Sequence, residues 1–166
     1  MGMADTPRPP KYWQGKLHDI GHDLPKVVKI DKKWEKQWGV QGTCAIPHPE
    51  EVDALMKKVP KGKVTTINEI RAALAKKHKA TIACPITTGI FATIAACAAT
   101  EQLKEGKKRV TPYWRTLKGD GEVNPKYPGG VAVISGLLKK EGLKTEKKGK
   151  SKVVVVDFEK KLAKLK

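Results

Sequence analysis

Cysteine and histidine are the side chains of this sequence that could supply a nucleophile, a general base or a metal ligand. The three cysteines, Cys44, Cys84 and Cys97, show no Cys-x-x-Cys or Cys-x-x-His spacing and stand among apolar or small residues. This pattern is typical of reduced, buried thiols, not of a zinc site or a disulfide framework. His78 belongs to a Lys-rich helix end, where we expect it to be solvated, and no neighbour in sequence would orient it as a base. The sequence therefore predicts no metal, no cofactor and no nucleophile paired with its base.

The segment 110–130, VTPYWRTLKGDGEVNPKYPGG, concentrates aromatic and turn-forming residues. We expect a short apolar strand over Val110–Leu117, a Gly-Asp-Gly turn at 119–121 and a Tyr-Pro-Gly-Gly loop at 127–130. Glycine-rich turns let the backbone approach a ligand closely, so the segment could be a binding loop held on a hairpin. It could equally be an ordinary hairpin with a connector, and turn chemistry leaves both open.

The charge balance points to a polyanionic partner. Lys and Arg number 34 against 17 Asp and Glu, for a formal net charge of +17, and such an excess attracts the phosphates of nucleic acid. Composition does not distinguish DNA from RNA or from an anionic membrane surface. No apolar run has the roughly 18 residues of a membrane span, and the first residues carry no secretory signal. We expect a cytoplasmic protein, nucleoid-associated if its source is bacterial or archaeal, with no membrane partner.

The elements that must hold the segment 110–130 are mostly helices. The stripe of apolar residues over 49–59 predicts a helix with Pro49 in its first turn. Thr66 and Glu69 form a capping box that begins a second helix, which ends in a Lys-rich stretch. The segment 131–142, VAVISGLLKKEG, predicts another helix with a glycine stop.

The stretch around residues 87–100 is free of basic residues, which is unusual in a chain of this charge. We expect a helix that begins near Thr87 or Thr88. Either this helix is buried all round, or it exposes a face of small residues that lets a bulky partner approach its backbone. The small residues of that face would be Gly89, Ala92, Thr93 and Ala96.

Two flanking regions differ from this helical part. Residues 1–48 contain five prolines and three of the four tryptophans, and we expect a mostly extended arm with a strand over 24–30. Asp31 should cap a short helix in which Trp34 and Trp38 share a face, either to pack on the core or to stack on bases.

The Lys-rich extension 143–166 should form a strand over 152–158 that pairs with 143–148, then a short amphipathic helix. The fold class is therefore mainly α with small β hairpins. We divide the chain into an arm (1–48), a domain with a helix-turn-helix (48–142) and a basic strand and helix extension (143–166).

The order of motifs over residues 48–142 resembles the C-terminal DNA-binding domain of the alkylguanine-DNA alkyltransferases and the alkyltransferase-like proteins. The motifs are PKGKVTT at 60–66, the capped helix, the small-residue helix, Pro-x-x-Arg at 112–115, Tyr-x-Gly-Gly at 127–130 and LLKKEG at 137–142. The resemblance implies a winged helix-turn-helix that places its recognition helix in the minor groove of double-stranded DNA. Of the two alternatives for the helix at 87–100, the resemblance favours an exposed face of small residues.

The positions that match the family's Pro-Cys-His-Arg motif read Pro112, Tyr113, Trp114 and Arg115. Alkyl transfer needs a thiolate, and a phenol with a pKa near 10 is mostly protonated at neutral pH. The resemblance therefore implies a non-enzymatic protein, as in alkyltransferase-like proteins that lack the acceptor cysteine. Glu141 matches the glutamate behind the cysteine, or it is a surface residue at a helix end.

The resemblance also implies a DNA interface. The base-pocket loop would be Tyr127, Pro128, Gly129 and Gly130, with Pro128 in place of a small hydroxyl residue. Contacts with DNA would come from Lys61, Lys63, Thr65, Thr66, Thr87, Thr88, Gly89, Thr93, Lys107, Lys108, Arg109 and Lys118. Ile67 replaces the family's tyrosine at the turn, and residues 85–100 hold no arginine finger.

Three functions stay open at this point. The chain could sense alkylated guanine for DNA repair, with a repair protein as a further partner, or it could bind nucleic acid without sequence or lesion preference. It could also be an enzyme with a rebuilt pocket around Tyr113, Trp114, Arg115 and Glu141, which would need Glu141 within hydrogen-bond reach of Tyr113. Tyr113 and Trp114 either fill the pocket or stack on a base. The arm could serve a protein partner, and the oligomeric state is open.

Overall fold

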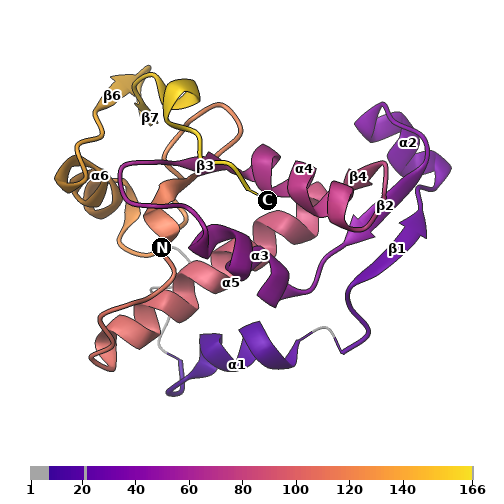
Figure 1. Ribbon diagram of the computed structural model, residues 1–166, viewed down its shortest axis with the longest axis horizontal. Coiled ribbons are helices and arrows are strands. Elements are labelled where there is room, and N and C mark those ends of the chain that lie inside the picture. Colours follow the sequence, from indigo (N-terminus) through magenta and orange to yellow (C-terminus); the bar gives the residue numbers. More distant parts are fainter. Residues whose placement is uncertain (1–7, 21, 166) are drawn as a thin grey trace.

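The long helix α5 (Pro85–Lys104) runs through the middle of the molecule (Figure 1). Helices α1 (Tyr12–Asp19), α3 (Pro49–Lys57) and α4 (Ile67–Lys77) pack against it. The computed structural model describes residues 8–20 and 22–165. Ten residues of α5 are buried, namely Thr88 and the run from Phe91 to Ala99. Because charged side chains are rarely buried, this central position explains why the stretch lacks lysine and arginine.

The burial of α5 corrects the expectation of an exposed face of small residues. Ala92 and Ala96 have no exposed surface, and Thr93 is only 8% exposed. Packing of the surrounding helices covers these positions, so the alternative of a helix buried all round holds for the middle of α5. Gly89, near the start of the helix, is half-buried.

Helix α5 begins at Pro85, slightly earlier than predicted. Cys84 is the N-cap, and its Sγ accepts a hydrogen bond from the Thr87 amide at 3.5 Å. Proline suits the first helical position because its missing N–H would have no partner there. Ile86 and Ile90, one turn apart on this first part of α5, are each 46% exposed.

Helices α3 and α4 begin at caps that the sequence largely specified. Thr66 accepts from the Glu69 amide at 3.2 Å, which confirms the predicted start of α4. In α3, the first position is Pro49, as predicted, and the N-cap is His48, whose Nδ1 accepts from the amide of Glu50 at 3.0 Å. Such caps satisfy amides that have no partner within the helix.

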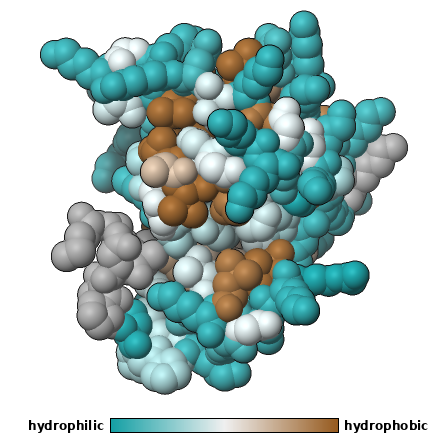
Figure 2. All heavy atoms as spheres, turned by 90° about the vertical axis from the view of Figure 1, so that its left-hand side faces the viewer, coloured by the Kyte–Doolittle hydropathy of each residue, from teal (hydrophilic) through white to brown (hydrophobic). Residues whose placement is uncertain are grey.

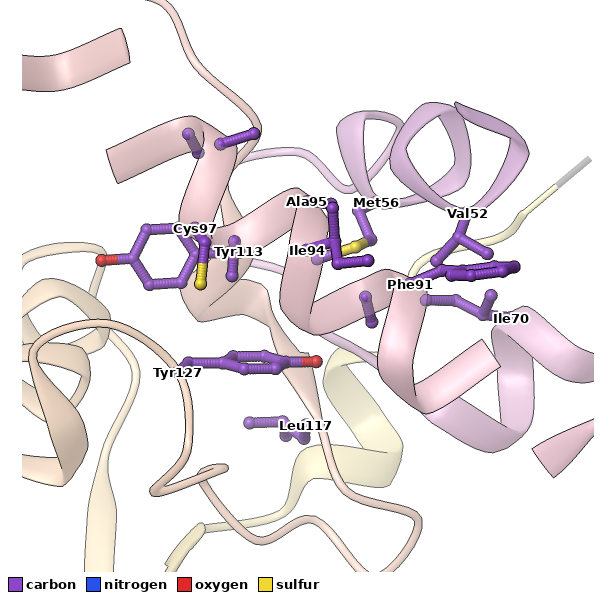
Figure 3. Close-up of a cluster of buried hydrophobic side chains, with 14 of the residues drawn as sticks. Val52, Met56, Ile70, Phe91, Ile94, Ala95, Cys97, Tyr113, Leu117 and Tyr127 are labelled. Carbon is purple, nitrogen blue, oxygen red and sulfur yellow. The ribbon is translucent and has the colours of Figure 1, made fainter. Parts of the chain in front are cut away.

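The main core lies between α3, α4 and α5, where the predicted stripes meet. Its largest fully buried side chains include Met56, Ile70 and Leu74. Figure 3 shows Val52 and Met56 from α3 and Ile70 from α4 directed toward α5. The apolar spacing of each helix therefore fixed which of its faces is buried.

A small sheet with strand order β1-β2-β4 forms a separate hydrophobic cluster beside this core. Its strands are β1 (Lys26–Lys29), β2 (Thr43–Ile46) and β4 (Ile82–Ala83), and β1 confirms the strand expected in the arm. Asp31 caps α2 (Lys32–Trp38) by accepting from the Trp34 amide at 3.1 Å, as predicted. Trp34 and Trp38 stack with ring centroids 4.7 Å apart and pack against this cluster, which favours the packing interpretation.

The N-terminal arm contains a helix that the sequence reasoning missed. Residues 1–7 lie outside the described residues, but α1 follows them and buries Trp13 and Leu17 in the main core. The amides of Trp13 and Gln14 both donate to the carboxylate of Glu101, at 2.9 Å each. A carboxylate of α5 therefore satisfies the first amides of α1, a long-range contact that no local pattern announces.

The segment 110–130 is not the hairpin that was expected. Only β5 (Thr116–Leu117) is a strand, and it pairs in parallel with β3 (Thr65–Thr66). The strand predicted over Val110–Leu117 is interrupted by Pro112 and the 3₁₀ turn η2 (Tyr113–Arg115). Proline has no N–H to donate to a neighbouring strand. The predicted turn at 119–121 is present, with the Gly121 amide donating to the Lys118 carbonyl at 2.9 Å.

The C-terminal part follows the prediction as far as its hairpin. Helix α6 (Gly130–Lys140) is followed by β6 (Thr145–Lys148) and β7 (Lys152–Val155), which pair antiparallel as expected. The amphipathic helix expected after them is absent from the described residues; a 3₁₀ turn η3 (Phe158–Lys161) stands there. The Val64 amide donates to the Lys161 carbonyl and the Ala163 amide to the Val64 carbonyl, which draws the chain out into an extended segment.

The coarse fold class is confirmed, since the described residues form six α-helices and small sheets. No helix in the described part of the chain has the length and apolarity needed to cross a membrane. Figure 2 shows the side on which α6 lies, where apolar residues gather in patches among hydrophilic ones. Val133 of α6 is 48% exposed, so this side is not a uniformly basic surface.

Candidate functional site

Arg115 and Glu141 form the ion pair at the centre of the candidate site. Glu141 follows the last turn of α6, and Arg115 ends the turn η2. Arg115 donates from Nε to Oε1 of Glu141 at 2.9 Å and from Nη2 to Oε2 at 2.6 Å, while its Nη1 donates to the Val59 carbonyl at 2.8 Å. The two side chains are only 14% and 8% exposed. Such a two-point pair fixes both orientation and distance.

The carboxylate of Glu141 also accepts from two further donors. Trp114 Nε1 donates to Oε2 at 3.0 Å, and the Gly62 amide donates to Oε1 at 3.4 Å. The Arg115 guanidinium lies 5.4 Å from the centroid of the Trp114 ring. Glu141 therefore ties the turn after α3, the turn η2 and the end of α6 together, and it is not the solvated helix-end residue of the alternative interpretation.

The surroundings of Glu141 favour its charged form. Burial acts to raise the pKa of this carboxyl, but the hydrogen bonds from Arg115 and Trp114 and the charge of Arg115 outweigh it, so the pKa lies below its ordinary value. Glu141 is therefore a fixed anion at neutral pH. An acid held in this state suits structural support and cannot act as a proton donor.

Tyr113 and Tyr127 are buried side by side at positions for which the sequence resemblance implied a base pocket. Each is 3% exposed, and their ring centroids lie 6.2 Å apart in an edge-to-face arrangement. Figure 3 shows both rings beside Cys97 of α5, with Leu117 next to Tyr127. The Tyr113 hydroxyl donates to the Pro128 carbonyl at 3.2 Å, and this bond joins Tyr113 to the loop 127–130. The side chain of Tyr113 thus fills space instead of lining an open cavity.

The chemistry of these two phenols is that of neutral side chains. Burial raises the pKa of Tyr113, an effect that a hydrogen bond with Thr100 partly offsets, and burial also raises the pKa of Tyr127. A higher pKa leaves even less phenolate at neutral pH. The bonds of Glu141 run to Trp114, Arg115 and Gly62, and the hydroxyl of Tyr113 bonds to a carbonyl instead. This geometry does not provide the pairing of Glu141 with Tyr113 that an enzymatic pocket would require.

Two glycines shape the loop 127–130. Gly129 and Gly130 have φ angles of 85° and 68°, in the left-handed region that glycine adopts at no steric cost. A Cβ on Gly129 would stand 2.7 Å from Cβ of Val133, so a side chain there would also clash with α6. Pro128 is buried, and Gly129 leads directly into α6.

The basic residues predicted to contact phosphates all lie at the surface. Six basic residues are exposed at the surface: Lys61, Lys63, Lys107, Lys108, Arg109 and Lys118. Lys61 and Lys63 flank Gly62, and Lys118 pairs with Glu122 at 3.2 Å. Lys107 and Arg109, with Lys57, line a hollow of about 320 Å³ that reaches Pro112. Exposed basic residues therefore stand next to Gly62, which bonds Glu141, and in the hollow that Pro112 lines.

The threonines proposed as DNA contacts are mostly unavailable, which corrects the sequence prediction. Thr65 and Thr88 are fully buried, while Thr66 and Thr93 are 3% and 8% exposed. Thr66 is used as the cap of α4, and Thr93 donates to the Gly89 carbonyl at 3.1 Å. Thr87 and Gly89 are half-buried and remain near the surface.

Two features of the surface were missed from the sequence. Ile86 and Ile90 are exposed on the first part of α5, and their four-residue spacing was the signal that could have found them. His78 is not a solvated end residue, because its Nε2 lies 2.8 Å from Glu51 Oε2. Glu51 also accepts from Lys77 Nζ at 2.6 Å, a contact between α3 and α4 that has no local signature.

Within residues 8–20 and 22–165, no group of three His, Cys, Asp or Glu side chains is placed to hold a metal ion. The three cysteines are buried and form no disulfide. Burial raises the pKa of Cys44 to about 11, with smaller contributions from Cys84. A thiol with so high a pKa is a poor nucleophile at neutral pH.

Comparison with known proteins gives one structural similarity to report. The crystal structure of S. pombe Atl1 in complex with damaged DNA containing O6-carboxymethylguanine is similar to this chain with a TM-score of 0.47 and 15% sequence identity. The similarity covers 70% of this chain and 94% of that one. No protein-family model matches the sequence, and no curated protein matches it.

Proposed function

We propose that this chain is a DNA-binding protein of the alkyltransferase-like type that binds the duplex without alkyl transfer. The observation that carries the proposal is the network around Glu141. Positions 112–115, 127–130 and 141, which the sequence resemblance singled out, come together through the bonds of Arg115, Trp114 and Tyr113. In this proposal Arg115 and Glu141 keep their places around the alkyl-acceptor site, while Tyr113 and Trp114 stand where that site would have a thiol and its base.

The DNA-binding surface in this proposal combines the start of α5 with the exposed lysines. The helices α4 and α5, joined through β4, act as the helix-turn-helix, and the segment 116–123 with the β6–β7 hairpin acts as the wing. Ile86 and Ile90 stand beside Gly89 at the start of α5. Minor-groove proteins insert apolar side chains of this kind between base steps, and basic residues on the flanks hold the phosphates.

Sensing of alkylated guanine is the finer form of the proposal. It requires a pocket that can receive the modified base. Tyr113 and Tyr127, which stand where the sequence resemblance implies that pocket, are each only 3% exposed. The buried rings favour the second candidate, a binder without sequence or lesion preference that keeps the scaffold and not the pocket. Opening the pocket would cost the Tyr113 bond to Pro128 and the packing of its ring.

The deciding experiment measures affinity for two duplexes that differ in one base. One carries a single O6-alkylated guanine and the other carries guanine, and both are titrated by fluorescence anisotropy at several salt concentrations. A clear preference for the alkylated duplex supports lesion sensing, whereas equal affinities with a steep salt dependence support the sequence-tolerant binder. Absence of binding to either duplex at low salt would refute the DNA-binding function altogether.

Ile90→Glu tests the proposed use of α5 in the same assay. The change places a carboxylate where the proposal puts DNA, and we expect a loss of affinity of about tenfold or more from charge repulsion and the lost apolar contact. Val27→Glu is the matched control, because Val27 is similarly exposed at 44% but lies in β1. The proposed position of the interface is wrong if both variants lose affinity equally.

A further inference from the structure

A groove between α3 and α4 stands apart from the Glu141 network. It has a volume of about 620 Å³, within the usual range of ligand sites. Its walls are the apolar side chains of Ala54 and Leu55 from α3 and Ala73 and Leu74 from α4, and Leu165 lies at its edge. In Figure 1 the C-terminal end of the chain lies between α3 and α4, in agreement with this lining.

The rim of this α3–α4 groove is predominantly positive. Among the described residues, Lys58, Lys76 and Lys77 line it, together with one carboxylate, that of Glu51. Glu51 is already engaged by Lys77 at 2.6 Å and by His78 at 2.8 Å. An apolar floor with basic edges is complementary to a ligand that combines apolar side chains with negative charge.

The chain's own C-terminal segment contributes to the lining of the groove. The Ala163 amide donates to the Val64 carbonyl at 2.8 Å, which fixes the segment beside the main core. Leu165 is half-buried and packs against that core from the edge of the groove. The C-terminal segment therefore adds one leucine side chain to the apolar lining of the groove.

The length of the groove matches two leucine side chains. Glu51, Ala54, Leu55 and Lys58 lie at positions i, i+3, i+4 and i+7 of α3, so they cover roughly 10 Å along the helix at about 1.5 Å per residue. Two leucines four residues apart on a partner helix are separated by about 6 Å along its axis. Amphipathic helices bind in grooves of this kind through such anchors.

We propose that the α3–α4 groove is a docking site for an acidic segment of a partner protein, which inserts leucine side chains between the two helices. The rim lysines bind the carboxylates of that segment, and Ala54 and Ala73 are small enough to admit its apolar side chains. This site uses neither the start of α5 nor the Glu141 network, although it shares α4 with the proposed helix-turn-helix.

The test uses the full chain and a fluorescein-labelled helical peptide of about twelve residues, with two leucines four apart and glutamates around them. Anisotropy at about 0.15 M salt reports binding, because weak charge attraction alone is screened there. Ala54→Trp fills the groove from an exposed position, and we expect it to weaken binding by about tenfold or more through loss of a leucine contact. Lys76→Glu should weaken binding about threefold or more by reversing a rim charge.

Two controls separate docking from the general attraction of a basic protein for acidic peptides. Lys36→Glu changes the net charge equally but lies on α2, and it should leave the affinity within about twofold. The same peptide with both leucines replaced by serine should bind at least about tenfold more weakly. The proposal is overturned if the serine peptide binds as well as the leucine peptide, if Lys36→Glu weakens binding as much as Lys76→Glu, or if correctly folded Ala54→Trp binds like the wild type.

Discussion

Replacing Glu141 with alanine should destabilise the protein strongly. The change leaves the charge of Arg115 without its partner, and Arg115 is 14% exposed, so water can replace the lost carboxylate only in part. It also removes the acceptor of Trp114 Nε1 at 3.0 Å and of the Gly62 amide at 3.4 Å. Arg115 keeps only its bond to the Val59 carbonyl among the bonds described above.

Removing one partner of a buried ion pair costs about 3–5 kcal/mol. We expect the lower end of this range, about 3 kcal/mol, because Arg115 retains one hydrogen bond and a little solvent contact. For a chain of this length each kcal/mol lowers Tm by about 2–4 °C, so Tm should fall by roughly 6–12 °C. Urea unfolding followed by circular dichroism gives the free energy directly, and thermal unfolding checks the shift in Tm.

The pH dependence gives a second, independent readout of Glu141. Since its folded pKa lies below the unfolded value, its contribution is fully present above the unfolded pKa and is lost as pH falls through the folded pKa. Glu141→Gln keeps the shape and removes the charge. The stability difference between wild type and this variant should therefore be largest at neutral pH and shrink as the pH falls below about 4.

Asp23→Ala is the control, because Asp23 and Lys26 form an exposed pair at 3.0 Å. Exposed pairs contribute little, and we expect no measurable change in the unfolding midpoint. The reasoning about Glu141 fails if Glu141→Ala unfolds at the same urea concentration as Asp23→Ala, or if the difference between wild type and Glu141→Gln stays constant across the pH range.

Three further changes test the supports of the helical core, each by urea unfolding. Glu51→Gln should lower stability at neutral pH, and the difference from wild type should vanish as the pH falls. The hydrogen bonds from Lys77, the His48 amide and His78 outweigh burial and hold the pKa of Glu51 below its ordinary value. A difference that does not depend on pH would contradict this reasoning. Thr66→Ala should cost about 1 kcal/mol through loss of the cap of α4, while Thr66→Ser should cost less. Leu74→Ala should cost about 2–5 kcal/mol because its side chain is fully buried, and a smaller loss would mean that the core collapses onto the cavity.

Local signals predicted the helices well. The cap at Thr66, the cap at Asp31 and the proline at position 49 each depend on atoms a few residues apart, so the sequence contains the whole interaction. The absence of basic residues around 87–100 indicated that this helix is either buried or exposes a face of small residues. It did not decide between burial and a small-residue face, because that choice depends on which elements pack against the helix.

Long-range contacts account for the errors. Helix α1 escaped notice because its first amides are satisfied by Glu101, almost ninety positions away in the chain. The strand β5 was assigned to a hairpin because its true partner, β3, lies some fifty residues earlier and pairs in parallel. His78 was expected in solvent for the same reason, since Glu51 belongs to another helix.

The sequence by itself determined the charge of the protein, most of its helices and the presence of Tyr113 and Trp114, not a thiol and an imidazole, at positions 113 and 114, because these depend on residue type or on neighbours along the chain. The tertiary structure alone decided that Glu141 pairs with Arg115 and that the Tyr113 ring is buried against the loop 127–130. It also decided that α3 and α4 leave a basic-edged groove between them. Burial and pairing between distant segments arise from packing, which the local spacing of residues does not encode.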